Sequence, residues 1–253
     1  RQRQMCIRDR AWAYAQDQLS STHPVFSDAG DIETVEANFD GITYAKGASV
    51  LKQLAAYVGL EEFFAGIRAH FAAHAWDNAT FTDLLGALEK ASGRDLSDWS
   101  DQWLRTTGIN TLTPVFEVAD GAYSSFAVEQ SGAQPGAGET RTHRIAVGVY
   151  SYEGGATGGK GGALKRTKRV ELDISGERTE VPELAGVPAG DLVLVNDDDL
   201  AYGNMALDEG SLATAIGGGD NDESGAGAGA GKPNIVRITD PMARALVWSA
   251  AWQ

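Results

Sequence analysis

The sequence has little cysteine, little positive charge and no long apolar run. Its one cysteine, Cys6, cannot form a disulfide within the chain, which fits a cytoplasmic location. No stretch reaches the roughly 18 apolar residues of a membrane span, and no apolar segment precedes a small-residue cleavage site, so we expect no membrane partner. The 21 Lys and Arg against 35 Asp and Glu exclude the basic surface that nucleic acid requires.

What is present suits a folded protein of one large domain or two smaller ones, since 43% of the 253 residues are hydrophobic. Residues 1–10 stand apart: they show no helical or strand period and carry four arginines. Translated back to codons, they match a transposase-type sequencing adapter, so we expect them to be an assembly artefact. A natural basic arm is the alternative. In either case Cys6 is a poor candidate nucleophile.

Apolar residues recur at three- and four-residue spacing in the first half of the chain, which predicts helices. The first begins near Ala11, and its start resembles a truncated helix. Glycines end two of the others, and Thr80 or Asn78 would cap one. Asp95 is expected to cap the last by accepting a hydrogen bond from the amide of Asp98. The remaining predicted helices cover residues 44–58, 60–74 with Phe64 and Phe71 on its apolar stripe, 80–91, and 95 to Gly108 with Trp99 and Trp103 facing inward.

From Thr111 the apolar period changes from 3.6 to 2. Five or six short strands without intervening helices predict an antiparallel sandwich. After Asp208 a helical pattern returns, broken by a flexible Gly/Ala insert at 217–231, and it resumes near Pro241 with an end that also resembles a truncation. After the first strands and their Asp120-Gly121 turn, the predicted strands cover 143–152, 168–174, 178–181 and 191–196, with a glycine-rich loop at 154–162.

The histidines do not form a recognisable catalytic motif. His70 and His74 have the spacing of the zinc motif HExxH, but Phe71 stands where the catalytic Glu would be, which favours two surface or half-buried histidines. His23 and His143 have no partner that spacing identifies, so hydrogen bonding or plain exposure is expected for both.

Other motifs are also incomplete. Residues 196–199 read Asn-Asp-Asp-Asp, like the start of a calcium loop, but Ala201 and Leu207 occupy the positions that require Gly and Glu. No phosphate-binding glycine loop occurs. Ser211 and Ser249 lack a nucleophile elbow and a His and Asp context, so a serine hydrolase is not supported.

Residues 41–48 carry a family resemblance. Tyr44, Lys46, Gly47 and Ala48 resemble the Tyr-x-Lys-Gly-Ala element of aminopeptidase N-type zinc metallopeptidases, the gluzincin aminopeptidases, in their actinobacterial branch. Further segments resemble this family in the same order: 99–103 with Gly108, 143–148, 194–202 and 207–211.

The resemblance implies a multidomain α and β fold. Residues 11–110 would form the helical C-terminal part of a thermolysin-like catalytic domain, 111–200 a small antiparallel β-sandwich and 201–253 the start of an α-helical domain. Tyr44 would stabilise the oxyanion while metal-activated water attacks the peptide, and Phe39 would contact the substrate's first side chain. Lys46 and Asp40 would be structural.

The chain departs from the family because it contains neither HExxH nor the second glutamate that follows it. Zinc is therefore implied in the full-length parent, with no metal ligand in this chain, which as a fragment would be inactive. The implied partners are peptide substrates, with no nucleic acid and no membrane, and the implied state is a monomer.

Two alternatives from other classes remain open. One is a non-catalytic binding or scaffold homologue that lost the metal site. The other is an unrelated glycan- or protein-binding sandwich, which requires exposed aromatic residues on its strands; the candidates are Tyr123, Tyr150 and Tyr152.

Overall fold

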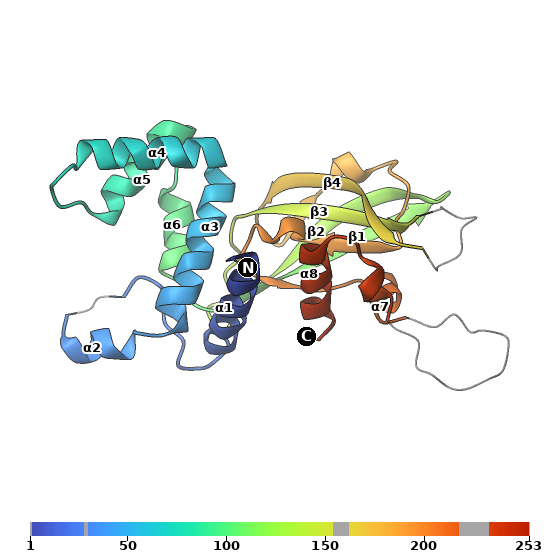
Figure 1. Cartoon of the computed structure of the whole chain (residues 1–253), viewed down its shortest axis with the longest axis horizontal. Helices are drawn as coiled ribbons and strands as arrows, with labels where there is room; N and C mark the ends of the chain where they lie inside the picture. Colours follow the sequence, from blue (N-terminus) through green and yellow to red (C-terminus); the bar gives the residue numbers. More distant parts are fainter. Residues whose placement is uncertain (1, 28–29, 154–161, 218–232, 253) are drawn as a thin grey trace. The chain divides into compact units, whose positions relative to one another are not determined.

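A computed structural model describes residues 2–27, 30–153, 162–217 and 233–252 of the chain. The chain divides into two compact units: Arg1–Ile109 with Gly132–Arg144, and Asn110–Ser131 with Ile145–Gln253. The first unit is helical and the second combines sheets with helices (Figure 1). The fold is thus mixed α and β, as the sequence predicted.

The first unit contains the helices that the apolar spacing predicted between residues 44 and 108. Two features differ from the prediction. The first helix begins at Gln2, within the stretch that showed no helical period, and a short helix at 32–37 had not been predicted. The elements are α1 (Gln2–Asp17), α2 (Ile32–Ala37), the π-helix η1 (Ile42–Lys46), α3 (Gly47–Val58), α4 (Leu60–Ala73), α5 (Phe81–Ser92) and α6 (Ser97–Leu104).

Local hydrogen bonds fix where these helices begin and end. Thr80 and Asp83 form a capping box at the start of α5, so Thr80, of the two expected candidates, is the cap. Gly59 ends α3 with a φ of 96°, which glycine adopts without strain. The predicted cap of α6 was wrong in detail: Asp95 accepts from the amide of Ser97 at 2.9 Å, because Leu96 is the last residue before the helix.

Helix α4 packs closely on α5 at Gly66. A Cβ atom added at Gly66 would lie 2.7 Å from the Leu88 side chain, so glycine permits the close approach of the two helices. Phe64 and Phe71 are exposed, Phe71 by 69%, although the period had placed them on the apolar face.

The returning segment at 132–144 is tied to the end of α6 by a buried arginine. Arg141 donates hydrogen bonds to the carbonyls of Gly108 at 3.0 Å and Thr107 at 2.7 Å. The Trp103 indole N–H donates to the Thr142 carbonyl at 3.0 Å. Because a buried guanidinium requires several acceptors, these carbonyls of the chain after α6 are held around Arg141.

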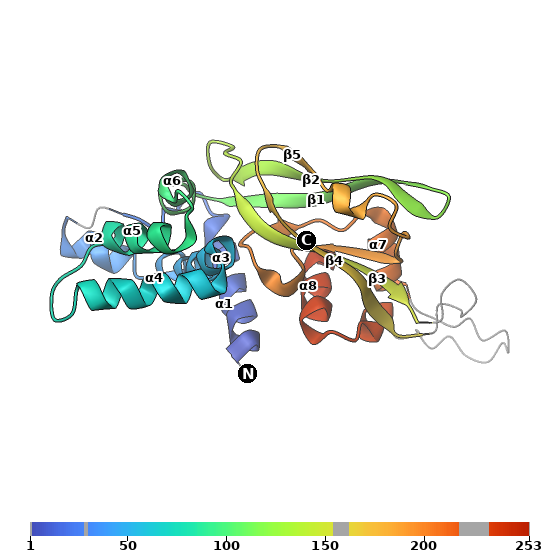
Figure 2. The same cartoon turned by 90° about the horizontal axis from the view of Figure 1, so that it is seen from above.

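The second unit has two sheets, with strand orders β5-β2-β1-β7 and β4-β3-β6. β2 pairs with β5 and β3 with β6 in antiparallel fashion, as predicted, whereas β1 and β7 are parallel, with Thr111 opposite Asn204. The two sheets can be followed in Figure 2. The strands are β1 (Ile109–Ala119), β2 (Ala122–Gln134), β3 (His143–Tyr152), β4 (Leu164–Ile174), β5 (Arg178–Glu180), β6 (Leu192–Val195) and β7 (Asn204–Met205).

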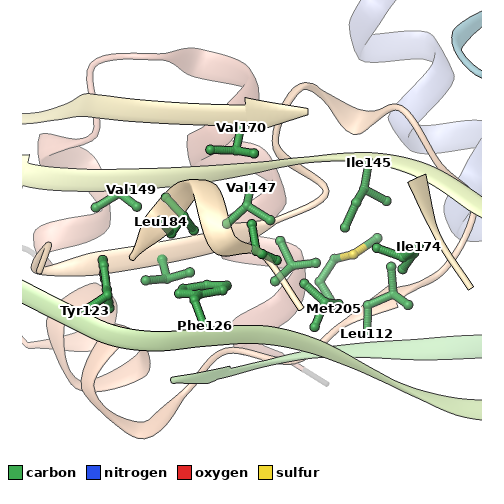
Figure 3. Packing of buried hydrophobic residues seen from close by; sticks show 14 of the residues in the cluster. Leu112, Tyr123, Phe126, Ile145, Val147, Val149, Val170, Ile174, Leu184 and Met205 are labelled. Carbon is green, nitrogen blue, oxygen red and sulfur yellow. The ribbon is translucent and has the colours of Figure 1, made fainter. Parts of the chain in front are cut away.

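Apolar side chains from both sheets form one core (Figure 3). A second apolar cluster joins the three-stranded sheet to α7 (Glu209–Ile216) and α8 (Pro241–Ala251), so residues after 200 pack in the same unit as the strands. The main core includes Leu112, Tyr123, Phe126, Ile145, Val147, Val149, Val170, Ile174, Val193, Val195 and Met205.

Short helical turns complete the unit: η3 (Pro182–Leu184), η4 (Asp197–Asp199) and η5 (Asn234–Arg237). The predicted insert at 217–231 lies outside the described residues except for Gly217, and the predicted loop at 154–162 does so except for Gly162. Over the described ranges, no helix combines the length and apolarity needed to span a bilayer. The domain ranges 11–110, 111–200 and 201–253 stay a prediction.

Candidate active site

Tyr44 lies in η1, a single π-helical turn at the start of α3. Helix α3 is labelled in Figure 1. The amide of Gly47 donates to the carbonyl of Ile42, five residues earlier, which defines the wider turn. Such turns inside helices occur frequently at functional sites. The turn buries Ile42, Ala45 and Lys46 and leaves the Tyr44 side chain 49% exposed.

Asp40 holds the N-terminal end of this turn. Its Oδ1 atom accepts hydrogen bonds from the amides of Ile42 at 2.9 Å and Thr43 at 3.1 Å. These amides would otherwise lack partners, because the first turn of a helix has no preceding carbonyls to bond. Asp40 Oδ2 lies 3.1 Å from Nε2 of His23. The contacts of Asp40 are thus structural.

Lys46 holds the other end of the turn. Its ammonium group lies 2.7 Å from Asp17 Oδ2, and both side chains are fully buried. Burial lowers the pKa of Lys46 even though the Asp17 carboxylate opposes that shift. Asp17 also accepts from the amide of Gly108 at 3.0 Å, so one carboxylate joins α1, η1 and the chain after α6.

Phe39 and Tyr44, the two predicted site residues, lie together. Their ring centroids are 4.8 Å apart in an edge-to-face arrangement, and Phe39 is 71% exposed. Tyr44 is one of the residues that line a mostly apolar groove of about 560 Å³ within the helical unit, and its phenol carries a hydroxyl that can donate a hydrogen bond. The other lining residues include Val25, Phe26, Ala48, Leu51, Leu54, Phe81, Leu84, Trp99 and Leu104.

His70 and His74 are half-buried on α4, with ring centroids 5.1 Å apart. The nearby carboxylate of Asp83 is engaged by Thr80 in the capping box. Catalytic zinc requires three protein ligands, and no group of three His, Cys, Asp or Glu side chains able to hold a metal occurs among the described residues. The described residues around His70 and His74 therefore do not fit a catalytic zinc.

The two isolated histidines have partners that spacing could not reveal. His23 contacts Asp40, as described above. His143 is fully buried with its ring edge-to-face on Trp103 at 4.9 Å. Burial, with a smaller contribution from the Arg141 charge, lowers the pKa of His143 to about 3, so its imidazole is neutral at physiological pH.

The acidic run at 196–199 is paired with arginines. Asp197 accepts from Tyr150 at 2.9 Å and from Arg166 at 2.8 Å, and Asp198 pairs with Arg169 at 2.7 Å. Burial and the Asp197 charge raise the pKa of Tyr150, which keeps its hydroxyl protonated as a donor. The carboxylates of Asp197 and Asp198 are therefore engaged in ion pairs with arginines of β4.

The aromatic residues required by a glycan-binding sandwich are not exposed. Tyr123, Tyr150 and Tyr152 are 1%, 0% and 6% exposed, because their strand positions face the cores of the second unit. Ser211 accepts a hydrogen bond from the amide of Val193 at 2.8 Å, so its hydroxyl joins α7 to β6. These contacts leave the turn around Tyr44 as the candidate site.

Comparison with known proteins shows what the helical unit is similar to. Residues 1–103, which include Tyr44, match the peptidase family M1 domain. Together with the relatives named below, this match supports an aminopeptidase N-type gluzincin of the actinobacterial branch, as the motifs predicted.

Named relatives agree with this assignment. The chain is 48% identical over 249 residues to "Aminopeptidase N" of Streptomyces lividans, which covers 96% of the chain and 26% of that protein. It is 38% identical over 96 residues to "Probable aminopeptidase 2" of Sulfurisphaera tokodaii, covering 38% of the chain and 12% of the relative. It is 37% identical over 100 residues to "Tricorn protease-interacting factor F2" of Thermoplasma volcanium, covering 40% of the chain and 13% of that relative.

The chain spans about a quarter of the length of the Streptomyces relative.

Proposed function

We propose that this chain is part of a zinc-dependent aminopeptidase that removes N-terminal residues from peptides. The observation that carries the proposal is the placement of Tyr44: a half-exposed phenol that lines an apolar groove, on a turn fixed at both ends, in a chain related to aminopeptidases. In this proposal the helical unit is the end of a thermolysin-like catalytic domain, the sheets are a β-sandwich domain, and α7 and α8 begin a further helical domain.

Tyr44 would act by donating its hydroxyl proton in a hydrogen bond to the oxyanion of the tetrahedral intermediate. A donor placed in advance where negative charge develops stabilises the transition state more than the substrate. Loss of one such donor lowers kcat by about 100- to 1,000-fold. The contacts of Asp40 and Lys46 hold the turn, so little reorganisation would accompany the reaction.

Phe39 would contribute an apolar contact beside Tyr44. Its exposed ring, edge-to-face with Tyr44, could cover the first side chain of a bound peptide. Truncating this ring would then change KM for substrates with large N-terminal side chains more than for those that begin with alanine.

Zinc, when bound in the full-length parent, would supply the electrophile and the activated water. Its ligands and the general base would come from residues that this chain does not contain. We propose accordingly that the chain alone binds no catalytic zinc and releases no N-terminal residues.

The experiment that tests the proposal compares Tyr44→Phe with Tyr57→Phe in the full-length protein that contains this chain. Tyr57 lies on α3, stacked on Trp99, and serves as a matched control. We expect Tyr44→Phe to lower kcat by at least about 100-fold with KM nearly unchanged, and Tyr57→Phe to retain activity. Equal kcat values for the two variants would reject the role of Tyr44.

Release of N-terminal residues by the purified 253-residue chain, in a manner abolished by chelators, would contradict the proposed inactivity of the chain alone. A full-length protein that folds but neither binds zinc nor cleaves peptides would be the binding or scaffold homologue instead.

A further inference from the structure

We propose that Asp40 and His23 are positioning residues that fix the Tyr44 hydroxyl through the π turn. This inference rests on the proposed role of Tyr44 and adds two residues that act through the turn that carries it. It comes from the hydrogen bonds of one carboxylate, which joins the turn to a loop seventeen residues earlier in the chain.

Asp40 accepts hydrogen bonds from three consecutive amides of the turn. Its Oδ1 atom accepts from Ile42 and Thr43, and its backbone carbonyl accepts from the amide of Tyr44 at 3.2 Å. A shift of Asp40 therefore moves the residue that carries the phenol. Helix α2 has a similar cap, in which Asp31 accepts from Thr34 at 2.7 Å, but its carboxylate makes no described bond to η1.

His23 holds the second oxygen of the same carboxylate. Its Nδ1 atom lies 2.8 Å from the Pro24 carbonyl and its Nε2 atom 3.1 Å from Asp40 Oδ2. Both contacts lie within hydrogen-bond distance, so the ring bridges the loop carbonyl and the carboxylate that caps the turn.

The loop that carries His23 is suited to this task. Pro24 fixes its own φ and restricts the preceding residue to extended conformations, so His23 sits on a stiff dipeptide. The His23 and Asp40 side chains are 21% and 20% exposed, which leaves the pair only partly screened by water. His23 thus fixes one oxygen of the Asp40 carboxylate, and the other oxygen accepts the amides of the turn.

Misplacement of a catalytic group by about 1 Å lowers a rate by as much as 100-fold. We expect His23→Gln to lower kcat by about 3- to 30-fold and to leave KM nearly unchanged, because the binding groove is intact while the donor is displaced. Asp40→Asn keeps one oxygen that can cap the turn but loses the second oxygen, which His23 contacts, so a similar loss is expected. Asp31→Asn is the matched control and should retain kcat.

The decisive readout is the dependence on Tyr44. In the full-length protein, His23→Gln and Asp40→Asn should lower kcat when Tyr44 is present and have little further effect in a Tyr44→Phe background. Equal losses in both backgrounds would overturn the inference while the role of Tyr44 stands. No effect of Tyr44→Phe itself would reject the proposed function instead, and with it the positioning role.

A second measurement on the 253-residue chain does not require catalysis. In that chain, amide exchange at Ile42 and Thr43 should quicken in His23→Gln but not in Asp31→Asn. Unchanged exchange in His23→Gln would overturn the inference even where Asp40→Asn fails to fold.

Discussion

The buried ion pair between Lys46 and Asp17 makes a sharp prediction about stability. Lys46→Met replaces the ammonium group by an apolar side chain of similar length and leaves the Asp17 carboxylate in a site where neither side chain is exposed. A buried charge without its partner is unfavourable because it has lost its hydration and received no opposite charge in return.

The expected loss follows from the remaining contacts of Asp17. Breaking a buried pair from one side typically destabilises a protein by about 3–5 kcal/mol. Asp17 keeps two donors, the Thr22 hydroxyl at 2.7 Å and the Gly108 amide at 3.0 Å, so we expect the lower end, about 3 kcal/mol. Asp17→Asn combined with Lys46→Met removes both charges and keeps an acceptor for these donors, and should recover at least about 1 kcal/mol.

Urea denaturation of the 253-residue chain, followed by circular dichroism, measures these losses. Lys90→Met is the matched control, since Lys90 is exposed on α5 and its loss should change the free energy of unfolding by less than about 0.5 kcal/mol. If Lys46→Met and Lys90→Met have the same effect, or if the double variant is less stable than Lys46→Met alone, the reasoning fails.

Two further predictions concern the packing around α6. The pKa of His143 is lowered from 6.5 to about 3, so as pH falls the imidazole of the unfolded chain binds a proton before that of the folded chain. The free energy of unfolding that is present above pH 6.5 is therefore lost as pH falls towards 3, by about 2 kcal/mol between pH 7 and 5. Urea denaturation at both pH values should show this loss in the wild type and a smaller one in His143→Gln, and equal losses would contradict it. Gly108→Ala should destabilise the chain by at least about 2 kcal/mol, because φ at Gly108 is 81° and the added Cβ would lie 2.3 Å from the Pro135 carbonyl oxygen. Gly86→Ala on α5, where the space for a Cβ is open, should stabilise the chain. Thermal denaturation distinguishes the two variants, and a Gly108→Ala chain as stable as the wild type would refute the proposed strain.

Elements could be predicted from the sequence where a period or a cap is local. The helix ending at Gly59, the cap at Thr80 and the strand at 143–152 depend on residues within a few positions of one another, and the structure contains all three. The prediction of which helix face is buried was less accurate. Phe64 and Phe71 of α4 are exposed although the period had placed them on the apolar face, and the close contact of α4 with α5 lies at Gly66, which carries no apolar side chain for a period to count.

The supports of the site could not be predicted, because they join residues that no spacing relates. Tyr44 and Phe39 were found through a motif, but the partner of His23 is Asp40 and the partner of Lys46 is Asp17. No pattern in the sequence indicated that Arg141 is buried, since a lone arginine before a strand resembles an exposed one. Its four acceptors come from a turn that only the fold brings to it.

The two side-chain pairs at the ends of η1, Lys46 with Asp17 and His23 with Asp40, differ in burial, so their loss should affect different properties. The Lys46 pair is fully buried, so its loss is felt mainly as an uncompensated charge and lowers the stability of the unit. The pair of His23 and Asp40 is partly exposed, so its loss leaves water as a substitute partner and changes stability less. What water cannot replace is the fixed position of the carboxylate that caps the turn. Changes at Lys46 should therefore appear first in unfolding, and changes at His23 first in kcat.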